Sequence, residues 1–309
     1  MTDQPKFEHV YQNHHIDSSR WDDFSPRDDD VVIATSYKAG TTWTQAIVAN
    51  LLFENGAFPA PVWEMSPWLD FRCQPHAEVK AALGGQSHRR FVKTHLPLNS
   101  LKFFPQLKYI FISRDGRDVF MSMWNHYSNY LPDSIELFNG PIDGVPRPGP
   151  EFPVAPDDIH ECWRNWCTRG SFDWETDGWP FWSHLSVTQS WWNYRHLPNV
   201  LTLHYGDMKA DTLGAVARIA DFLEVPITPK RLAQVAEAVS IDTMRPKGAT
   251  YAPRGGAAWK GGSDTFLNKG TNRRWEGILS AEELALYDQA CERTLSPDCR
   301  EWLERGGVV

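Results

Sequence analysis

The chain has 309 residues, enough for one large α/β domain or two ordinary ones with a sizeable buried core. Its formal net charge of −8 argues against nonspecific binding to nucleic acid or to an anionic membrane, but it does not exclude a basic pocket for a small anion. The 5 cysteines fit no zinc-site spacing, the N-terminal segment has no secretory signal pattern, and no apolar run reaches the length of a membrane span. We therefore expect a reduced, cytoplasmic protein with no nucleic-acid or membrane partner.

Four short apolar runs predict buried strands, and helical patterns lie between and after them. Strands that alternate with helices predict βαβ units, and we expect one doubly wound domain over residues 1–309 with a central, mainly parallel sheet flanked by helices on both faces. The predicted strands are Val31–Thr35, Arg90–Thr94, Tyr109–Ser113 and Val200–Tyr205, and the predicted helices are Thr42–Phe53, Asp115–Tyr130, Pro180–Arg195 and Asp207–Leu223.

Two segments interrupt this alternation of strands and helices. Residues 131–159 are dense in Pro, Gly and Asp, which disfavour regular structure. Residues 245–269 combine several glycines with basic residues, and a long loop of this kind inside a compact domain is often a lid. We therefore expect residues 131–159 to be irregular and residues 245–269 to form a lid loop.

One local segment points directly to a ligand. Residues 36–43 read Ser-Tyr-Lys-Ala-Gly-Thr-Thr-Trp and connect the first predicted strand to its helix. Such a loop presents unpaired backbone N–H groups, and the helix dipole adds partial positive charge. Gly40 lets the backbone approach an oxyanion closely, Lys38 supplies a full charge, and the hydroxyl groups of Thr41 and Thr42 can donate to phosphate oxygens. Together these features predict an anion-binding site.

The order of residues in this loop separates two kinds of nucleotide enzyme. The P-loop of nucleotide hydrolases requires a Gly-Lys pair followed by Ser or Thr. Here Lys38 precedes Gly40, so the lysine that pairs with β- and γ-phosphates is missing and the hydroxyl group that holds magnesium is displaced. A metal-dependent small-molecule kinase therefore becomes a weaker alternative.

The loop resembles the 5′-phosphosulfate loop of the cytosolic-type sulfotransferases, which use 3′-phosphoadenosine-5′-phosphosulfate (PAPS). The family's Tyr-Pro-Lys-Ser-Gly-Thr-Thr-Trp corresponds to residues 36–43, with Tyr37 in place of the proline and Ala39 in place of the serine. The resemblance implies a P-loop-like fold. It also assigns to donor binding the residues Lys38, Ala39, Gly40, Thr41, Thr42 and Trp43.

A second match is Lys93-Thr94-His95-Leu96-Pro97, at the end of the second predicted strand. It resembles the family's Lys-Thr-His-Leu-Pro, in which the histidine is the catalytic base. A neutral imidazole can take a proton from a hydroxyl group, and ligands of open α/β sheets bind at the carboxyl ends of strands. The resemblance implies that His95 deprotonates the acceptor, that Lys38 stabilises the bridging oxygen of the donor, and that Lys93 helps to hold the sulfuryl oxygens.

A third match covers residues 109–122, which follow the family pattern of an arginine at a strand end and a serine eight positions later. The resemblance implies that Arg114 and Ser122 bind the 3′-phosphate of the nucleotide. Arginine suits this task because its planar guanidinium group meets two phosphate oxygens at once.

Two later stretches extend the resemblance towards the C-terminus. Residues 205–209 resemble the family's Tyr-Glu-Asp-Met-Lys, which implies that Tyr205 approaches the adenine. Residues 266–270 resemble an element that closes on the 3′-phosphate, which implies a role for Asn268, Lys269 and Gly270. Three positions depart from the family. Asn268 stands where arginine is usual, Arg273 replaces the element's second glycine, and Ile241 stands where an aromatic residue is usual. Arg273 or Arg274 is a candidate to compensate for the missing arginine.

The resemblance extends from about Val31 to Trp275, with residues 131–177 as a variable insertion. It implies PAPS as donor, 3′-phosphoadenosine-5′-phosphate (PAP) as product, no metal, and transfer to a hydroxyl or amine group of a small acceptor. The 15 tryptophans, many of them within residues 163–192, favour a lipophilic or aromatic acceptor, and a sugar acceptor stays open. The family's usual dimer motif is not evident, so a homodimer is left open.

Two alternatives to this function are a P-loop small-molecule kinase that uses Mg²⁺ and a non-catalytic nucleotide-binding protein of the same fold. The first requires the Gly-Lys-Ser/Thr loop that the sequence lacks. The second is favoured by the departures at Asn268 and Ile241, and it is opposed by the presence of both Lys38 and His95.

Overall fold

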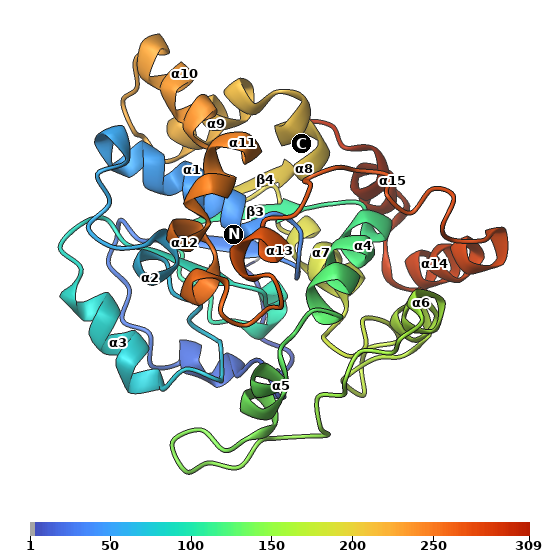
Figure 1. The fold of residues 1–309 in the computed structure, drawn as a ribbon. Helices are drawn as coiled ribbons and strands as arrows, with labels where there is room; N and C mark the ends of the chain where they lie inside the picture. Colours follow the sequence, from blue (N-terminus) through green and yellow to red (C-terminus); the bar gives the residue numbers. More distant parts are fainter. Residues whose placement is uncertain (1–3) are drawn as a thin grey trace.

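The computed structural model describes residues 4–309, and its centre is a sheet of four parallel strands (Figure 1). The strand order is β2-β1-β3-β4, so the first strand lies inside the sheet. Nearly all strand residues are buried, as expected for a parallel sheet that is covered on both faces. The strands are β1 (Val31–Thr35), β2 (Phe91–Thr94), β3 (Lys108–Ser113) and β4 (Val200–His204).

Helices surround this sheet, and two of them begin just after strand ends that carry predicted site residues. β1 leads through the phosphate loop into α1 (Thr41–Leu52), and β3 leads into α4 (Gly116–Tyr127). The other α-helices are α2 (Val62–Met65), α3 (His76–Gly85), α5 (Pro132–Asn139), α6 (Ile159–Thr168), α7 (His184–Trp192), α8 (Tyr205–Ala210), α9 (Thr212–Phe222), α10 (Pro229–Ala238), α11 (Ile241–Met244), α12 (Gly248–Tyr251), α13 (Gly262–Phe266), α14 (Ala281–Thr294) and α15 (Pro297–Arg305).

The sheet separates two hydrophobic cores, because successive residues of a strand point to opposite faces. In β1, Val31 and Ile33 belong to the core formed with α1, α9 and α10. Val32 and Ala34 belong to the core formed with α4, α6, α7, α14 and α15. Figure 1 shows the first group at the upper left and most of the second group at the right. This arrangement confirms the predicted α/β fold with helices on both faces of a parallel sheet.

Two of the predicted secondary-structure assignments are wrong in detail. Residues 131–159 are not wholly irregular, because they contain α5. This helix has a proline in its first turn and is followed by Gly140, and both residue types are common at helix boundaries. The predicted helix 207–223 divides into α8 and α9 at Asp211. The Asp211 carboxylate accepts a hydrogen bond of 2.8 Å from the Gly214 N–H and so caps α9.

The predicted loop at residues 245–269 is largely made of short helical turns. It contains α12, α13 and two 3₁₀ turns, Arg245–Lys247 and Pro253–Gly256. Its glycines serve the tight connections between these turns: Gly256 has φ +89°, and a Cβ atom there would lie 2.2 Å from the Ser263 backbone nitrogen. Trp191 and Trp192 are buried core residues, as expected for the tryptophan pair. No helix formed by residues 4–309 is both long and apolar enough to cross a membrane.

Candidate active site

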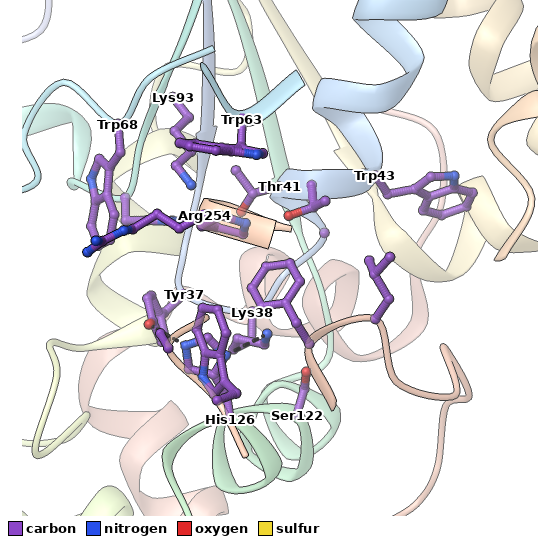
Figure 2. A pocket seen from close by; sticks show the side chains of 18 of the residues that line it. Tyr37, Lys38, Thr41, Trp43, Trp63, Trp68, Lys93, Ser122, His126 and Arg254 are labelled. Atoms are coloured by element: carbon purple, nitrogen blue, oxygen red, sulfur yellow. Dashed lines mark hydrogen bonds between the residues drawn. The ribbon is translucent and has the colours of Figure 1, made fainter. Parts of the chain in front are cut away.

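The carboxyl ends of the strands open onto one large cavity of about 1140 Å³. This is the edge at which parallel α/β sheets bind ligands, because loops and helix N-termini converge there. Figure 2 shows the cavity with Trp43 and Trp68 on opposite sides, Lys93 and Thr41 between them, and Tyr37 and Lys38 across from Lys93. Most of the predicted site residues therefore meet in one place although they come from five separate segments of the chain.

The phosphate loop has the backbone shape that anion binding requires. Lys38 has φ +67° and Gly40 has φ +120°, so the chain turns sharply before α1 begins at Thr41. A Cβ atom at Gly40 would lie 2.9 Å from the Tyr205 ring, so only glycine fits without displacing that side chain. The Thr41 and Thr35 hydroxyl oxygens are 2.6 Å apart, which ties the start of α1 to the end of β1.

Two lysines place positive charge inside the cavity, and neither is paired with a carboxylate from the described part of the chain, residues 4–309. Lys38 Nζ is 3.2 Å from His126 Nδ1 and lies over the Phe266 ring, whereas Lys93 Nζ lies over the Trp68 ring. Burial lowers the pKa of Lys38 to about 7 and that of Lys93 to about 8. The cause is that burial removes part of the water around each ammonium group. A bound anion would provide an oppositely charged partner for each lysine.

His95 is oriented by the end of the neighbouring strand. Its Nδ1 atom is 3.0 Å from the Thr35 carbonyl oxygen. Because a carbonyl oxygen can only accept, Nδ1 carries the proton and Nε2 carries the lone pair. Burial, with a smaller contribution from the Lys93 charge, lowers the pKa of His95 to about 3, so the imidazole is neutral at physiological pH. The Trp68 and Tyr37 rings pack at 4.6 and 5.4 Å from the His95 ring and fix its plane.

Arg114 lies at the end of β3 with its guanidinium group over the Tyr205 ring, 4.3 Å from the centroid. Its Nη2 atom donates to the Thr271 carbonyl at 3.0 Å and to the Asn272 side-chain oxygen at 2.8 Å. Its Nε atom is buried and has no hydrogen-bond partner among residues 4–309. Ser122, two turns along α4, also lines the cavity. An anion at this position fits the unused donor of Arg114.

A flat group fits between the loop and α11. Trp43 and Tyr205 pack edge to face with centroids 5.4 Å apart, and the Trp43 indole N–H donates to the Val239 carbonyl at 2.9 Å. Ser240 and Ile241 line the cavity beside them. Ile241 thus provides an aliphatic contact where an aromatic one was expected from the resemblance.

The structure distinguishes between the predicted residues of the last element. Asn268 and Gly270 line the cavity, whereas Lys269 is exposed to solvent and is not part of the lining. Of the two arginines that follow, Arg274 lines the cavity, and Arg273 is three-quarters exposed and forms an ion pair with Glu276.

Ala39 also lies outside the lining, although it belongs to the phosphate loop. Its side chain is fully buried and does not face the cavity. Lys209, which the resemblance did not assign, lines the cavity and donates from Nζ to the Gly270 carbonyl at 2.7 Å.

A buried histidine that sequence reasoning missed joins two parts of the site. His184 Nδ1 is 2.5 Å from the Ser36 hydroxyl oxygen, and its Nε2 is 2.9 Å from the Arg114 carbonyl oxygen. Nε2 therefore donates to the carbonyl, and Nδ1 accepts from the serine. His184 thus connects the phosphate loop to the Arg114 strand end. Its position at the start of α7 gave no sequence signal of this role.

The far half of the cavity is lined by aromatic side chains that come from segments distant in sequence. Trp68 stacks on Phe71 at 4.7 Å, and Tyr130 stacks on Trp259 at 5.7 Å. Sequence reasoning expected an aromatic pocket but looked for it in residues 163–192, which mostly pack in the core. The aromatic side chains that line the cavity outside the phosphate loop include Trp63, Trp68, Phe71, Tyr130, Phe138 and Trp259.

Comparison with known proteins identifies the family of this chain. A family model described as the sulfotransferase domain matches residues 28–300. The chain belongs to the sulfotransferase domain family. A protein of Mycobacterium bovis named glycolipid sulfotransferase is 30% identical to this sulfotransferase over 96% of the chain and 94% of its own length. Rat sulfotransferase 1A1 is 25% identical over 89% of the chain and 87% of its own length.

A solved structure shares the fold of this sulfotransferase. The crystal structure of mouse sulfotransferase SULT7A1 complexed with PAP superimposes with a TM-score of 0.70 and 17% sequence identity, covering 96% of both chains. The family match and the 30% identical relative identify the chain as a sulfotransferase, and the small-molecule kinase alternative is not supported.

Proposed function

We propose that this sulfotransferase moves a sulfuryl group from PAPS to a hydroxyl or amine group of a small, lipophilic or aromatic acceptor, and releases PAP. The single observation that carries this proposal is the position of His95. Its Nδ1–H is held by the Thr35 carbonyl, and its ring lies between a cationic strand-end region and an aromatic region of the same cavity. The mouse sulfotransferase of the same fold, which was solved with PAP, supports this choice of donor.

The nucleotide fits the strand-end region by the chemistry of its donors. The backbone N–H groups at the start of α1, with the Thr41 and Thr42 hydroxyl groups, hold the 5′-phosphosulfate end. Arg114, with its unused Nε donor, holds the 3′-phosphate together with Ser122. Trp43 and Tyr205 bind the adenine face.

Asn268 and Gly270 close this end of the site, and Arg274 supplies the charge that Asn268 does not. Lys269 is better regarded as a surface residue, since its side chain is exposed. Ala39 contributes its backbone only, because its side chain faces the core.

PAPS supplies the activated sulfuryl group when it is bound, and three side chains act on the reaction. His95 Nε2 takes the proton from the acceptor hydroxyl group, which frees that oxygen to bond to sulfur. Lys38 stabilises the charge on the bridging phosphate oxygen as its bond to sulfur breaks, and Lys93 holds the sulfuryl oxygens. The two lysines suit this task because neither forms an ion pair with a carboxylate of residues 4–309.

The acceptor binds against the aromatic region. Rings such as Trp68, Phe71 and Trp259 offer apolar faces that suit a phenol, a sterol-like alcohol or another lipophilic alcohol. Aromatic faces also stack on sugar rings, and the M. bovis relative is named a glycolipid sulfotransferase, so a lipid-linked sugar is a second candidate acceptor.

Residues 245–269 act as a lid in this proposal, because Arg254, Ala258 and Trp259 from this segment line the cavity (Figure 2). The enzyme works in the cytoplasm, which agrees with its 5 free, buried cysteines. Acceptor and donor are its only required partners, and the proposal needs no second copy of the chain.

The test is a pair of measurements on the purified chain. Calorimetric titration with PAP is expected to show binding, and radiolabelled PAPS is expected to label members of a panel of phenols, sterols and glycolipids without added Mg²⁺. Binding of PAP with no transfer to any acceptor would favour a non-catalytic nucleotide-binding protein. Turnover with ATP that depends on Mg²⁺ would favour the kinase.

A further inference from the structure

A cluster of rings lies between the phosphate loop and the aromatic region, and neither donor binding nor proton transfer uses it. His126 on α4 is 3% exposed and lies between Lys38 on one side and two phenols on the other (Figure 2). Its Nε2 atom is 2.7 Å from the Tyr37 hydroxyl oxygen and 2.8 Å from the Tyr130 hydroxyl oxygen. The two phenol oxygens are themselves 2.8 Å apart.

The proton positions in this cluster follow from Lys38. A bound nucleotide anion keeps Lys38 in its charged form, and a lysine ammonium group only donates hydrogen bonds. In the donor complex His126 Nδ1, 3.2 Å from Lys38 Nζ, must therefore accept one. Burial, together with the nearby Lys38 charge, keeps the pKa of His126 well below its usual value, so the ring carries a single proton. That proton is therefore on Nε2, which faces the two phenols.

Counting hydrogens then shows that one phenol hydroxyl must donate outside the cluster. Nε2–H donates to one phenol oxygen, and one phenol O–H fills the contact between Tyr37 and Tyr130. The other phenol O–H has no acceptor within the cluster. The protonated Nε2 has no free lone pair, and the hydrogen bond between the two phenol oxygens is already made by the first O–H. Both phenols line the cavity, so a ligand bound there can accept this hydrogen.

We propose that His126 is a positioning residue between the two substrates, and that the Tyr37–Tyr130 pair is a specificity determinant that donates a hydrogen bond to a second oxygen of the acceptor. This inference rests on the proposed function, since it concerns the same cavity. The second oxygen lies close to the hydroxyl group that is sulfated, because the Tyr37 ring is 5.4 Å from the His95 ring. The preferred acceptors are thus alcohols or phenols with a neighbouring ether or hydroxyl oxygen.

The pair is rigid enough to select an acceptor in this way. Tyr37 stacks on Phe181 at 4.5 Å, and Tyr130 packs against Trp259 and Phe138 at 5.7 and 5.1 Å. Each hydroxyl group is thereby held near its hydrogen-bond partners without an entropic cost at the moment of binding. The family resemblance could not predict this role, because the family has proline at the position of Tyr37.

The first experiment compares two phenols of similar shape, ortho-methoxyphenol and ortho-ethylphenol, in the presence of saturating PAP. Their dissociation constants are measured by quenching of tryptophan fluorescence, since several tryptophans line the cavity. Loss of one neutral hydrogen bond corresponds to roughly 3- to 10-fold in affinity, so the methoxy compound is expected to bind tighter by this factor. The double variant Tyr37→Phe with Tyr130→Phe is expected to bind both equally.

Tyr194→Phe is the matched control, because its phenol lies outside the cavity lining and its loss is expected to leave the preference unchanged. Equal affinity of the unaltered protein for the two phenols, or binding of neither, contradicts the proposal. So does a double variant that keeps the preference. Sulfuryl transfer by a protein that shows no such preference would overturn this inference alone and leave the proposed function standing.

The second experiment separates the two sides of His126. In His126→Asn the amide oxygen takes the position of Nδ1 and keeps the Lys38 contact, whereas in His126→Gln the amide nitrogen takes the position of Nε2 and keeps the phenol contact. We expect His126→Asn to raise the acceptor KM by about 3- to 10-fold with PAP affinity unchanged. We expect His126→Gln to weaken PAP binding by a similar factor with the acceptor KM unchanged. If both variants change both constants alike, His126 has a structural role only.

Discussion

The two halves of the cavity are built from different kinds of structure. The donor half is formed by the ends of β1, β3 and β4, where hydrogen-bonded strands and the N-terminus of α1 fix the backbone. The acceptor half is formed by short helices and irregular segments, with Trp68, Tyr130 and Trp259 coming from three distant parts of the chain.

Under the proposed function, this difference separates a donor site fixed by the sheet from an acceptor site built of side chains. Phosphate recognition needs a fixed backbone and a few charges, which a sheet edge provides. Acceptor recognition depends on side chains carried by loops, and these can change without altering the sheet. The predictions below test whether the two halves can be disrupted separately.

The largest expected effect is at His95, which lies between the halves. His95→Ala removes the proton acceptor and is expected to lower kcat by about 10²- to 10⁴-fold, while the dissociation constant for PAP stays unchanged. Initial rates with labelled PAPS and calorimetry with PAP measure the two quantities. His196→Ala, at an exposed position, serves as the control. Near-full turnover of His95→Ala would remove it from the role of base.

The donor half is tested at Arg114. Arg114→Lys keeps the charge but loses the planar pair of donors, so PAP is expected to bind about 10- to 100-fold more weakly. Adenosine 5′-phosphosulfate, which lacks the 3′-phosphate, is expected to bind the variant as well as it binds the unaltered protein. Arg305→Lys, on the surface, is the control. Equal weakening of both nucleotides would mean that Arg114 does not read the 3′-phosphate.

The pH dependence of donor binding tests the buried lysines. A lysine whose pKa is about 7 loses its proton as the pH rises from 7 to 9, and a nucleotide anion binds its charged form. Binding must then take up a proton, so PAP affinity is expected to fall with rising pH, by up to about tenfold per pH unit for each proton taken up. The phosphate groups are already largely ionised above pH 7, so they contribute little to this slope.

The lysine responsible for this pH dependence is identified with Lys38→Arg, because a guanidinium group stays charged throughout the range. The variant is expected to show a shallower slope when PAP affinity is measured by calorimetry between pH 6.5 and 9. An unchanged slope would assign the titration to another group, with Lys93 as the next candidate.

The smallest expected effect is in the acceptor half, at Phe71. Phe71→Ala removes part of one apolar wall, and a loss of about 1 kcal/mol of burial free energy corresponds to roughly a fivefold higher acceptor KM. PAP affinity is expected to stay the same, since Phe71 contacts Trp68 and lies away from the phosphate loop. An equal change in both constants would show that the two halves do not act independently.

The donor half was predictable from sequence because its signals are local. Strand, loop and helix follow one another within residues 31–52, and the spacing from Arg114 to Ser122 follows from one strand end and one helix. The position of His95, just after β2 and in the cavity, was predictable for the same reason. The sequence could not show that Lys269 faces solvent while Arg274 lines the cavity, because the backbone of this segment has no regular period.

The acceptor half was not predictable in the same way, because its residues meet only through the tertiary fold. The 15 tryptophans indicated an aromatic pocket but not which of them line it. His126 lies four residues after Ser122 on the same helix, yet its contacts with Tyr37 and Lys38 depend on the packing of α4 against the phosphate loop. His184 likewise acquires its role only where α7 meets two strand ends.

The most direct test of the division between the halves is a crystal structure of the enzyme with PAP bound. We predict the 5′-phosphate over the N-terminus of α1, the 3′-phosphate at Arg114 and Ser122, the adenine beside Trp43, and an open aromatic half. A nucleotide that lies in the aromatic half, or in the reverse orientation, would contradict this account.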